Sequence, residues 1–382
     1  AKIKGITLLG TGDFTHELWL KELKTQLRYN ENGMLANRDG FPFILSSEIS
    51  SIYKQDGAVR RVHNVILSPD FETVDQIRDV LKKRGVNIDS DGRPICGIPS
   101  HELVELVKEI NSRNEIIPAH IWTPWFSLFG SKSGFDKIED CYKDQTKHIH
   151  ALETGLSSDP AMNWRLSQLD KYSLVSFSDL HSYWPWRIGR EATLFDLGVL
   201  NYDNIIRALR TKDGLTGTIE VDPSYGKYHH DGHRACNVNF TPAESKKHNN
   251  ICPVCKKPLT IGVLNRIEEL ADRKEGFKPD GSKPFHSLMP LSEIISFVMN
   301  TGIMTKKVWD VYNKLIGRFD SEINVLMNTK LEDMEKVCDK RIAKMIVDVR
   351  NGNIKVDAGY DGVYGNISKD KNKPPQKSLS DF

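Results

Sequence analysis

Short apolar runs alternate with amphipathic stretches from Ile6 to about Pro223, and this alternation constrains the fold more than any other feature of the sequence. The stretches Phe71–Arg84 and His101–Ser112 place apolar residues at helical spacing. The apolar runs predict strands at Ile6–Leu9, Phe43–Ile49, Val62–Leu67, Ile116–His120, His148–Glu153, Leu174–Ser178 and Thr216–Val221. Such strand–helix alternation predicts an α/β fold, either a barrel or a doubly wound sheet.

The composition changes after this segment and divides the chain into four parts. Residues 1–225 form the alternating part, and residues 226–262 are rich in His, Cys, Asn and Lys. Residues 263–367 are predicted to be a helical region that ends in a small hairpin, and the polar tail at 368–382 is expected to be disordered. A chain of 382 residues has room for such an arrangement of two or three domains.

Almost every predicted strand of the first part ends in a carboxylate or a histidine. These residues are Asp13, Glu48, His63, His120, Asp179 and His181. In parallel α/β folds the carboxyl ends of the strands converge on one mouth, so five strands would deliver six ligands to one cleft. Because a mixture of imidazole and carboxylate groups suits Zn, Mn or Fe, we expect a metal centre there.

Each of these residues taken alone has a simpler explanation. A single histidine at a strand end is more often a capping or hydrogen-bonded residue, and Asp13 could cap the helix that follows it. The metal interpretation depends on the whole set, because five independent caps would not so consistently be metal-ligand types. Asp179 and His181 are two residues apart, so their side chains would point the same way from a strand end and could share a metal.

A second set of metal-ligand types lies in the His- and Cys-rich part. His233-Arg-Ala-Cys236 and Cys252-Pro-Val-Cys255 are two x-x-spaced pairs separated by fifteen residues, a spacing typical of a zinc ribbon with a tetrahedral structural zinc. His230 is a competing ligand for His233, and free thiols that happen to be near one another are the alternative. The other three cysteines are scattered, which fits a reduced, cytoplasmic protein.

The order and context of the strand-end residues resemble the successive motifs of polymerase-and-histidinol-phosphatase (PHP) domains. The motifs are Gly10-Thr-Gly-Asp13, Ser46-Ser-Glu48, Arg61-Val-His63, Pro118-Ala-His120 and Ser178-Asp-Leu-His181. Three longer stretches are more similar still to the endonuclease Q family. They are Ile121-Trp-Thr-Pro-Trp-Phe-Ser-Leu-Phe-Gly130, Ala151-Leu-Glu-Thr-Gly-Leu-Ser-Ser-Asp159 and Ser178-Asp-Leu-His-Ser-Tyr-Trp-Pro-Trp186. The resemblance covers essentially the whole chain.

The resemblance implies a fold, an activity and a substrate. The fold implied is a distorted PHP-type β/α barrel that holds up to three metal ions (Zn, Mn or Mg) and hydrolyses phosphoesters, followed by the zinc ribbon and an α-helical region. The activity implied is cleavage of DNA on the 5′ side of uracil, hypoxanthine or an abasic site by metal-activated water. Asp179 or His181 would act as the catalytic proton relay.

The sequence departs from the PHP pattern at its start. PHP domains open with a strand that carries a His-x-His motif, and a further ligand follows soon after it. This sequence has neither, and its first strand corresponds to the second strand of the family. We therefore expect a preceding segment that carries those ligands, which an in-frame Asp-Leu-His-x-His upstream of Ala1 in the genome would reveal.

Aromatic and basic residues surround the expected metal mouth. They are Phe14, Trp122, Trp125, Phe126, Trp184, Trp186, Arg187 and Arg190. A damaged base must be flipped out of the duplex to be read, and aromatic faces could stack on it while arginines grip phosphates. For any single ring, packing of its loop onto the barrel is the simpler explanation, so the prediction is that at least one of the group contacts a base.

The chain ends in a peptide with a recognisable spacing. Gln376, Leu379 and Phe382 resemble the segment by which repair enzymes dock on the sliding clamp (PCNA), although that motif usually has two aromatic residues.

A net charge of +2 does not by itself indicate nucleic-acid binding. No apolar run approaches the length of about 18 residues that a transmembrane helix needs, and the first segment lacks the layout of a signal peptide.

Two other functions compete with a DNA endonuclease. A small-molecule PHP phosphatase would use the same metal centre but would not need the ribbon, the helical region or the tail. A non-catalytic DNA-binding or scaffold protein would tolerate an incomplete metal centre.

Overall fold

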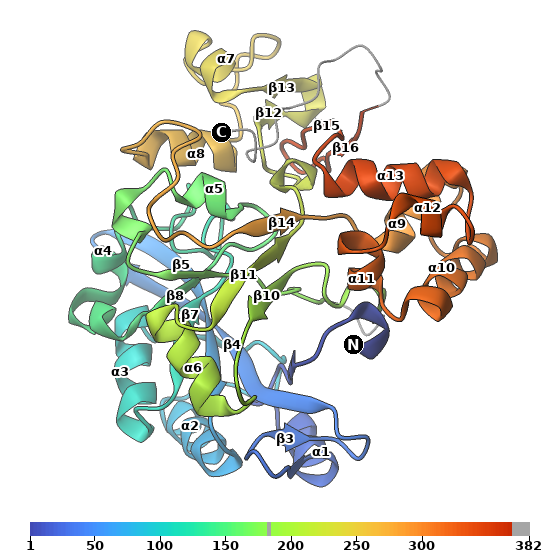
Figure 1. Ribbon diagram of the computed structural model, residues 1–382. Coiled ribbons are helices and arrows are strands. Elements are labelled where there is room, and N and C mark those ends of the chain that lie inside the picture. The colour runs from blue at the N-terminus through green and yellow to red at the C-terminus, as the bar shows by residue number, and fades with distance from the viewer. Residues whose placement is uncertain (182–184, 369–382) are drawn as a thin grey trace.

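The computed structural model describes residues 1–181 and 185–368 as a mixed α/β structure (Figure 1). Its longest described strands are β4 (Pro42–Gln55) and β5 (Ala58–Ser68), which form one antiparallel hairpin. The hairpin turns at Asp56 and Gly57, both of which have positive φ angles, 53° and 75°. An Asp-Gly pair favours this tight turn because both residues tolerate the left-handed conformation.

Short strands extend this hairpin into a mixed sheet. β1 (Leu9–Gly10) runs parallel to β4, and β7 (Glu115–Pro118) runs antiparallel to β5. The sheet also contains β2 (Arg28–Tyr29), β3 (Leu35–Ala36) and β6 (Ile95–Cys96). The α/β class is confirmed, but the central pairs β4–β5 and β5–β7 are antiparallel, whereas the sequence suggested a parallel sheet. Closure of these strands into a barrel stays a prediction.

Two further sheets continue the first part of the chain. β8 (Ala151–Glu153) and β9 (Ser173–Val175) pair in parallel. β10 (Ala192–Phe195) is antiparallel to β11 (Leu215–Glu220), which is in turn parallel to β14 (Phe285–Ser287).

Helices cover these sheets. They are α1 (Glu17–Gln26), α2 (Phe71–Lys83), α3 (Ser100–Ile110), α4 (Ile138–Tyr142), α5 (Pro160–Asn163) and α6 (Tyr202–Thr211). The predicted helices at 71–84 and 101–112 are thereby confirmed. In α2 the Asp70 side chain accepts a hydrogen bond from Thr73 N, and Val74, Ile77 and Leu81 are buried at helical spacing. The largest core forms where helices α1 to α5 pack with the β4–β5 hairpin, whereas α6 packs in a separate, smaller core.

The His- and Cys-rich part forms a small separate lobe at the top of Figure 1. It contains the antiparallel pair β12 (Asp231–His233) and β13 (Val238–Phe240), followed by α7 (Pro242–Lys247). Its hydrophobic core is small and centres on Val238 and Leu259. A core of this size usually needs a metal or disulfides to be stable.

The predicted boundary of the helical region at 263 is too early. α8 (Val263–Leu270) packs into the first core through Val263 and Ile267, and β14 belongs to a sheet. The helical region therefore begins after β14 and has its own core. Its helices are α9 (Leu291–Met299), α10 (Lys306–Phe319), α11 (Glu322–Met327), α12 (Leu331–Met334) and α13 (Lys340–Arg350).

The predicted C-terminal hairpin is present. β15 (Val356–Asp357) pairs antiparallel with β16 (Asn366–Ile367). Short 3-10 helices occupy Lys2–Lys4, Lys143–His148, Ser167–Leu169, Pro185–Arg187, Pro223–Tyr225 and Arg234–Cys236. Within the described ranges no helix combines the length and the apolar character that a membrane crossing requires.

Candidate metal centre and its surroundings

Three of the six predicted ligands form one compact group. Ligand atoms of Glu48, His63 and His120 all lie within 4.8 Å of one another. Glu48 Oε1 is 2.6 Å from His63 Nδ1 and 3.3 Å from His120 Nε2, and the two imidazole nitrogens are 3.1 Å apart. Two imidazoles and one carboxylate at these separations are a donor set that suits a divalent transition metal.

The reason why Glu48 and His63 meet differs from the one that the sequence suggested. Neither residue ends a strand: Glu48 lies in the middle of β4, and His63 lies in the middle of β5. The antiparallel register pairs Glu48 with Val65 and Ser50 with His63, so the two side chains are diagonal neighbours across the hairpin. Only His120, which follows β7, reaches the group from the end of a strand.

The charges within the group fit metal binding. Burial alone would raise the pKa of Glu48, but hydrogen bonds from His120 and His63 hold it well below its usual value. Burial lowers the pKa of His63, which favours the neutral imidazole that a metal requires. Burial would also lower the pKa of His120, yet the contact with Glu48 and the charges of Glu153 and Asp179 raise it to about 9. A bound cation would replace the proton that His120 carries here.

The other three predicted ligands lie outside this compact group. Asp13 is close enough to Glu48 that the two charges interact. Burial is the main cause that raises the pKa of Asp13, and the charges of Asp91 and Glu48 raise it further. The charge of Asp179 also reaches the group, because it raises the pKa of His120. His181 is exposed, and its Nδ1 lies 3.0 Å from the backbone oxygen of Asp179. The convergence of all six residues on one metal centre therefore stays a prediction.

Backbone strain marks the same residues. Asp13, His120 and Asp179 have φ angles of 48°, 31° and 42°, a region that non-glycine residues rarely adopt. Such conformations cost about 1–3 kcal/mol each and cluster at functional sites, because the surrounding structure must hold them in place. The strain falls on predicted ligands from three separate loops, which supports a shared function.

The structure adds Glu153, a buried residue that our prediction of the ligands did not include. Its Oε2 accepts a hydrogen bond from the backbone N–H of His120 at 2.8 Å, and its backbone oxygen accepts one from Ile121 N at 3.1 Å. Burial raises the pKa of Glu153 to about 8, with the Asp179 charge adding to the effect. Glu153, the last residue of β8, thus holds the strained backbone of His120 in place through its carboxylate.

Gly155 completes this support, because a Cβ atom there would lie 2.5 Å from the Cβ of His120. Its φ angle of 64° also disfavours a side chain. We expect Gly155→Ala to displace His120 and to reduce catalytic activity roughly 100-fold, the usual effect of an error of about 1 Å at a reacting centre. Steady-state cleavage kinetics would measure the loss.

Gly85→Ala is the matched control for this variant. Gly85 has a φ angle of 77°, but a Cβ there would meet nothing within 4 Å. Both variants should lose thermal stability from backbone strain, of the order of 1 kcal/mol, and Gly155→Ala should lose more because of its clash with His120. If Gly155→Ala were as active as Gly85→Ala, the support of His120 by Gly155 would be disproved.

Two further buried carboxyls, those of Glu191 and Glu220, lie near the loop that carries Asp179. Glu191 precedes β10 and Glu220 ends β11, beside the paired residues Ala192 and Ile219. Glu220 accepts hydrogen bonds from the hydroxyls of Thr218, Ser176 and Thr154, whereas Glu191 Oε2 has no partner among the described residues. Burial raises the pKa of both carboxyls. The Glu220 charge adds to the effect on Glu191, and the Asp159 charge adds to the effect on Glu220.

The predicted base-contacting residues fall into different environments. Phe14 and Trp122 are 0% and 1% exposed and pack in the main core, which is the simpler explanation that the sequence offered for any single ring. That at least one residue of the group contacts a base stays a prediction. Phe126 is half-buried, with its ring centroid 5.0 Å from that of His63. Trp184 lies outside the described residues, as do Gln376, Leu379 and Phe382 of the predicted clamp-binding peptide.

The residues that follow Trp184 border the Asp179 loop. Trp186 packs near Trp309, with ring centroids 6.3 Å apart. Arg187 is exposed and lies 3.9 Å from Glu293, whereas Arg190 donates hydrogen bonds to the backbone oxygens of Ser178 and Asp179. Arg190 therefore supports the loop, and Arg187 is the better placed of the two to reach a phosphate.

The second candidate metal group is complete. Ligand atoms of His233, Cys236, Cys252 and Cys255 lie within 4.8 Å of one another, with His233 Nδ1 3.4 Å from Cys255 Sγ. His230 is outside this group, and its Nδ1 instead lies 2.9 Å from Asn239 Oδ1. The structure thus selects His233 between the two candidate histidines. Binding of zinc by the group stays a prediction.

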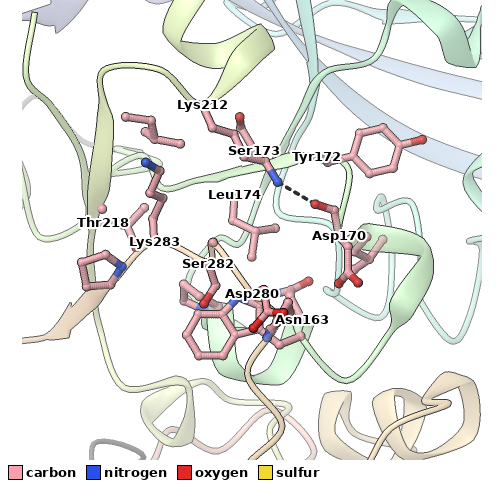
Figure 2. Close-up of a pocket in the computed structure, with 18 residues that line it drawn as sticks. Asn163, Asp170, Tyr172, Ser173, Leu174, Lys212, Thr218, Asp280, Ser282 and Lys283 are labelled. Atoms are coloured by element: carbon pink, nitrogen blue, oxygen red, sulfur yellow. Dashed lines mark hydrogen bonds between the residues drawn. The ribbon is translucent and has the colours of Figure 1, made fainter.

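A separate pocket lies away from both candidate metal groups (Figure 2). It encloses about 550 Å³ of space open to solvent, between the first residues of β9 and β11 and the loop 279–284. Within it Lys212 Nζ donates a hydrogen bond to the backbone oxygen of Asp170 at 2.6 Å. None of the predicted metal ligands lines this pocket, so its size does not identify the functional site.

Comparisons with known proteins find relatives of this chain. The family described as the MJ0043 C-terminal domain matches residues 290–353, which are the helical region. The chain is similar to the uncharacterized protein MJ0043 of Methanocaldococcus jannaschii, with 35% identity over 65% of this chain and 31% of that protein, so it spans about a third of the length of this relative. It is also similar to the uncharacterized protein YqxK of Bacillus subtilis, with 30% identity over 95% of this chain and 89% of YqxK.

Two solved structures are similar over nearly the whole chain. One is the lesion-specific endonuclease PfuEndoQ of Pyrococcus furiosus, with a TM-score of 0.85 and 33% identity over 96% of this chain and 88% of that one. The other is endonuclease Q in complex with a 27-mer duplex that has an abasic lesion at the active site. It has the same TM-score and identity, over 97% of this chain and 90% of that one.

Proposed function

Because this chain belongs to the endonuclease Q family, we propose that it is a metal-dependent DNA repair endonuclease that hydrolyses a phosphodiester beside a damaged nucleotide. The proposed substrates are duplexes with uracil, hypoxanthine or an abasic site, cut on the 5′ side of the lesion. The observation that carries the proposal is the compact group of Glu48, His63 and His120 in a chain that resembles an endonuclease bound to lesion DNA.

The donor set supports a divalent metal ion such as Zn, Mn or Mg at this group. Glu48 is held ionised, and His63 is held neutral, as ligation requires. A metal ion bound there would polarise a phosphoryl oxygen and lower the pKa of a water molecule. Asp13, whose charge interacts with that of Glu48, and Asp179, whose charge interacts with that of His120, are the proposed additional carboxylate ligands.

We assign proton transfer to Asp179 and His181. The exposed ring of His181 has its Nδ1 near Asp179, 3.0 Å from the backbone oxygen and 3.4 Å from Oδ1, so its Nε2 can face a solvent or substrate oxygen. This arrangement suits an acid that protonates the leaving oxygen of a phosphodiester. Phe126, Trp186 and Arg187 are the proposed contacts to base and phosphate.

The test is a cleavage assay with the full-length protein as its gene encodes it. Duplexes with one uracil, one hypoxanthine or one abasic site should be cut once, on the 5′ side of the lesion, and an undamaged duplex should not. Activity should be lost with a chelator and restored by Mn or Zn. Hydrolysis of a small phosphomonoester but not of DNA would favour a small-molecule phosphatase, and lesion binding without cleavage would favour a non-catalytic protein.

A further inference from the structure

A row of aromatic rings and cations runs from the candidate metal centre to the C-terminal hairpin. We call this set the aromatic row; it consists of Phe126, Trp125, Tyr228 and Tyr364, with the cations Arg61 and Lys227. The predictions made from the sequence assigned no function to Arg61, Lys227, Tyr228 or Tyr364. The row belongs to three separate parts of the chain that the fold brings together.

The row starts at the metal centre. The ring of Phe126 packs on His63, and the guanidinium carbon of Arg61 lies 5.5 Å from the centroid of the Phe126 ring. The adjacent residue Trp125 packs edge-to-face on Tyr228, with ring centroids 5.4 Å apart. The loop that follows His120 therefore links the metal ligands directly to the lobe that holds the four-ligand group.

The far end of the row is open to solvent. Lys227 Nζ lies 5.8 Å from the ring centroid of Tyr228 and 5.6 Å from that of Tyr364. Tyr364 is 65% exposed, so its ring is accessible to a ligand. A cation placed between two aromatic rings is the combination that grips a phosphate while the rings accept bases.

The outer residues of the row are held in place by the lobe. The backbone N–H groups of Gly362 and Gly365 donate hydrogen bonds to the backbone oxygens of Lys227 and Tyr225, at 2.8 and 3.1 Å. Asp361, in the hairpin that carries Tyr364, accepts a hydrogen bond from Arg234 N at 2.7 Å. Figure 1 shows the β15–β16 hairpin beside β12 and β13, as these contacts require.

We propose that the aromatic row binds the unpaired nucleotides of the DNA strand next to the lesion. This inference rests on the proposed function and extends it to how the strand is held. Only unpaired bases offer free faces to aromatic rings, because the bases of a duplex are stacked on one another. Lys227 and Arg61 would lie along the phosphates, and the row would lead the strand toward the group of Glu48, His63 and His120.

The cations Arg61 and Lys227 favour a nucleic acid over a peptide as the ligand of the aromatic row, because they would lie along its phosphates. Stacking on bases does not depend on sequence, since every base has an aromatic face. This tolerance suits an enzyme that meets lesions in any sequence context. The direct contact of Phe126 with His63 places one end of the row at the reacting centre, which an independent docking site for a protein would not need.

The test compares Tyr364→Ala and Lys227→Ala with the wild type and with a control. Tyr29→Ala is the control, because Tyr29 is 53% exposed and lies on β2, which pairs with β3 at the opposite end of the molecule in Figure 1. Tyr364→Ala should weaken the Kd for an abasic duplex and for a single-stranded oligonucleotide about tenfold. Lys227→Ala should reduce the salt slope of log Kd by about one.

Tyr364→Ala and Lys227→Ala should show the weaker binding as a higher KM for lesion cleavage, whereas the control Tyr29→Ala should keep the affinity and the cleavage rate of the wild type. Thermal melting verifies that all variants fold. Equal binding of single-stranded DNA by the wild type and Tyr364→Ala would overturn the inference, whatever the cleavage activity. If the wild type cut no lesion DNA but Tyr364→Ala still lost single-strand affinity, the proposed function would fail while the row remained supported.

Discussion

Glu48→Gln should lose about 10³-fold or more in kcat/KM for lesion cleavage while the protein stays folded. The substitution keeps the size of the side chain but removes the charge that holds two histidines, at 2.6 Å from His63 and 3.3 Å from His120. Without the carboxylate the group has two neutral donors and binds a divalent cation poorly. Loss of roughly 4 kcal/mol of metal stabilisation of the transition state corresponds to about this factor.

Two measurements check this prediction. Metal analysis should show that Glu48→Gln has lost metal, and single-turnover cleavage should show that the loss lies in the chemical step. Glu102→Gln is the matched control, because Glu102 has one cation contact, 2.5 Å from Arg84 Nη1, and lies outside the metal centre. If Glu48→Gln cleaved within tenfold of this control, the metal centre would have been placed wrongly.

Cys252→Ser should remove one zinc ion per chain and lower thermal stability sharply. Cys252 is fully buried, and the backbone N–H groups of Cys255 and Val254 lower its pKa against the opposing effect of burial, which favours the thiolate that zinc binds. Structural zinc contributes about 10–16 kcal/mol of apparent binding energy in isolated zinc-finger peptides. Because the core around Val238 and Leu259 is small, the lobe has little else to stabilise it.

Cys338→Ser provides the control for this variant, since Cys338 is half-buried in the helical region and belongs to neither metal group. Its zinc content should equal that of the wild type. Cys252→Ser should also bind single-stranded DNA more weakly, because the lobe positions Lys227 and the hairpin that carries Tyr364. Unchanged zinc stoichiometry in Cys252→Ser would contradict the assignment of the four ligands.

The sequence predicted which segments are strands better than how they pair. The apolar runs at 43–49 and 62–67 lie within β4 and β5, but their antiparallel pairing was missed. A signal for it was present, because Asp56-Gly57 between two strand candidates favours a tight hairpin. The prediction that Glu48 and His63 lie close together therefore succeeded although its geometric premise was wrong.

Two other features could not be predicted from local pattern. Glu153 ends an apolar run that looks like a core strand, and only the tertiary structure reveals that its carboxylate holds the backbone of His120. β14 is three residues long and follows a Gly- and Pro-rich loop, so its strand conformation depends on pairing with β11. The choice of His233 over His230 likewise depends on which side chain the β12–β13 turn directs toward the cysteines.

The buried carboxyls Glu191 and Glu220 make unfolding a proton-releasing reaction. Their pKa values are raised in the folded state by burial, so near neutral pH the folded protein holds protons that the unfolded chain gives up. The stability that these groups provide is full below the pKa of the unfolded chain and is lost as the pH rises through the folded value. The heat of unfolding will consequently contain the heat with which the buffer takes up those protons. Calorimetric enthalpies in Tris and in phosphate should then differ at the same pH and the same Tm.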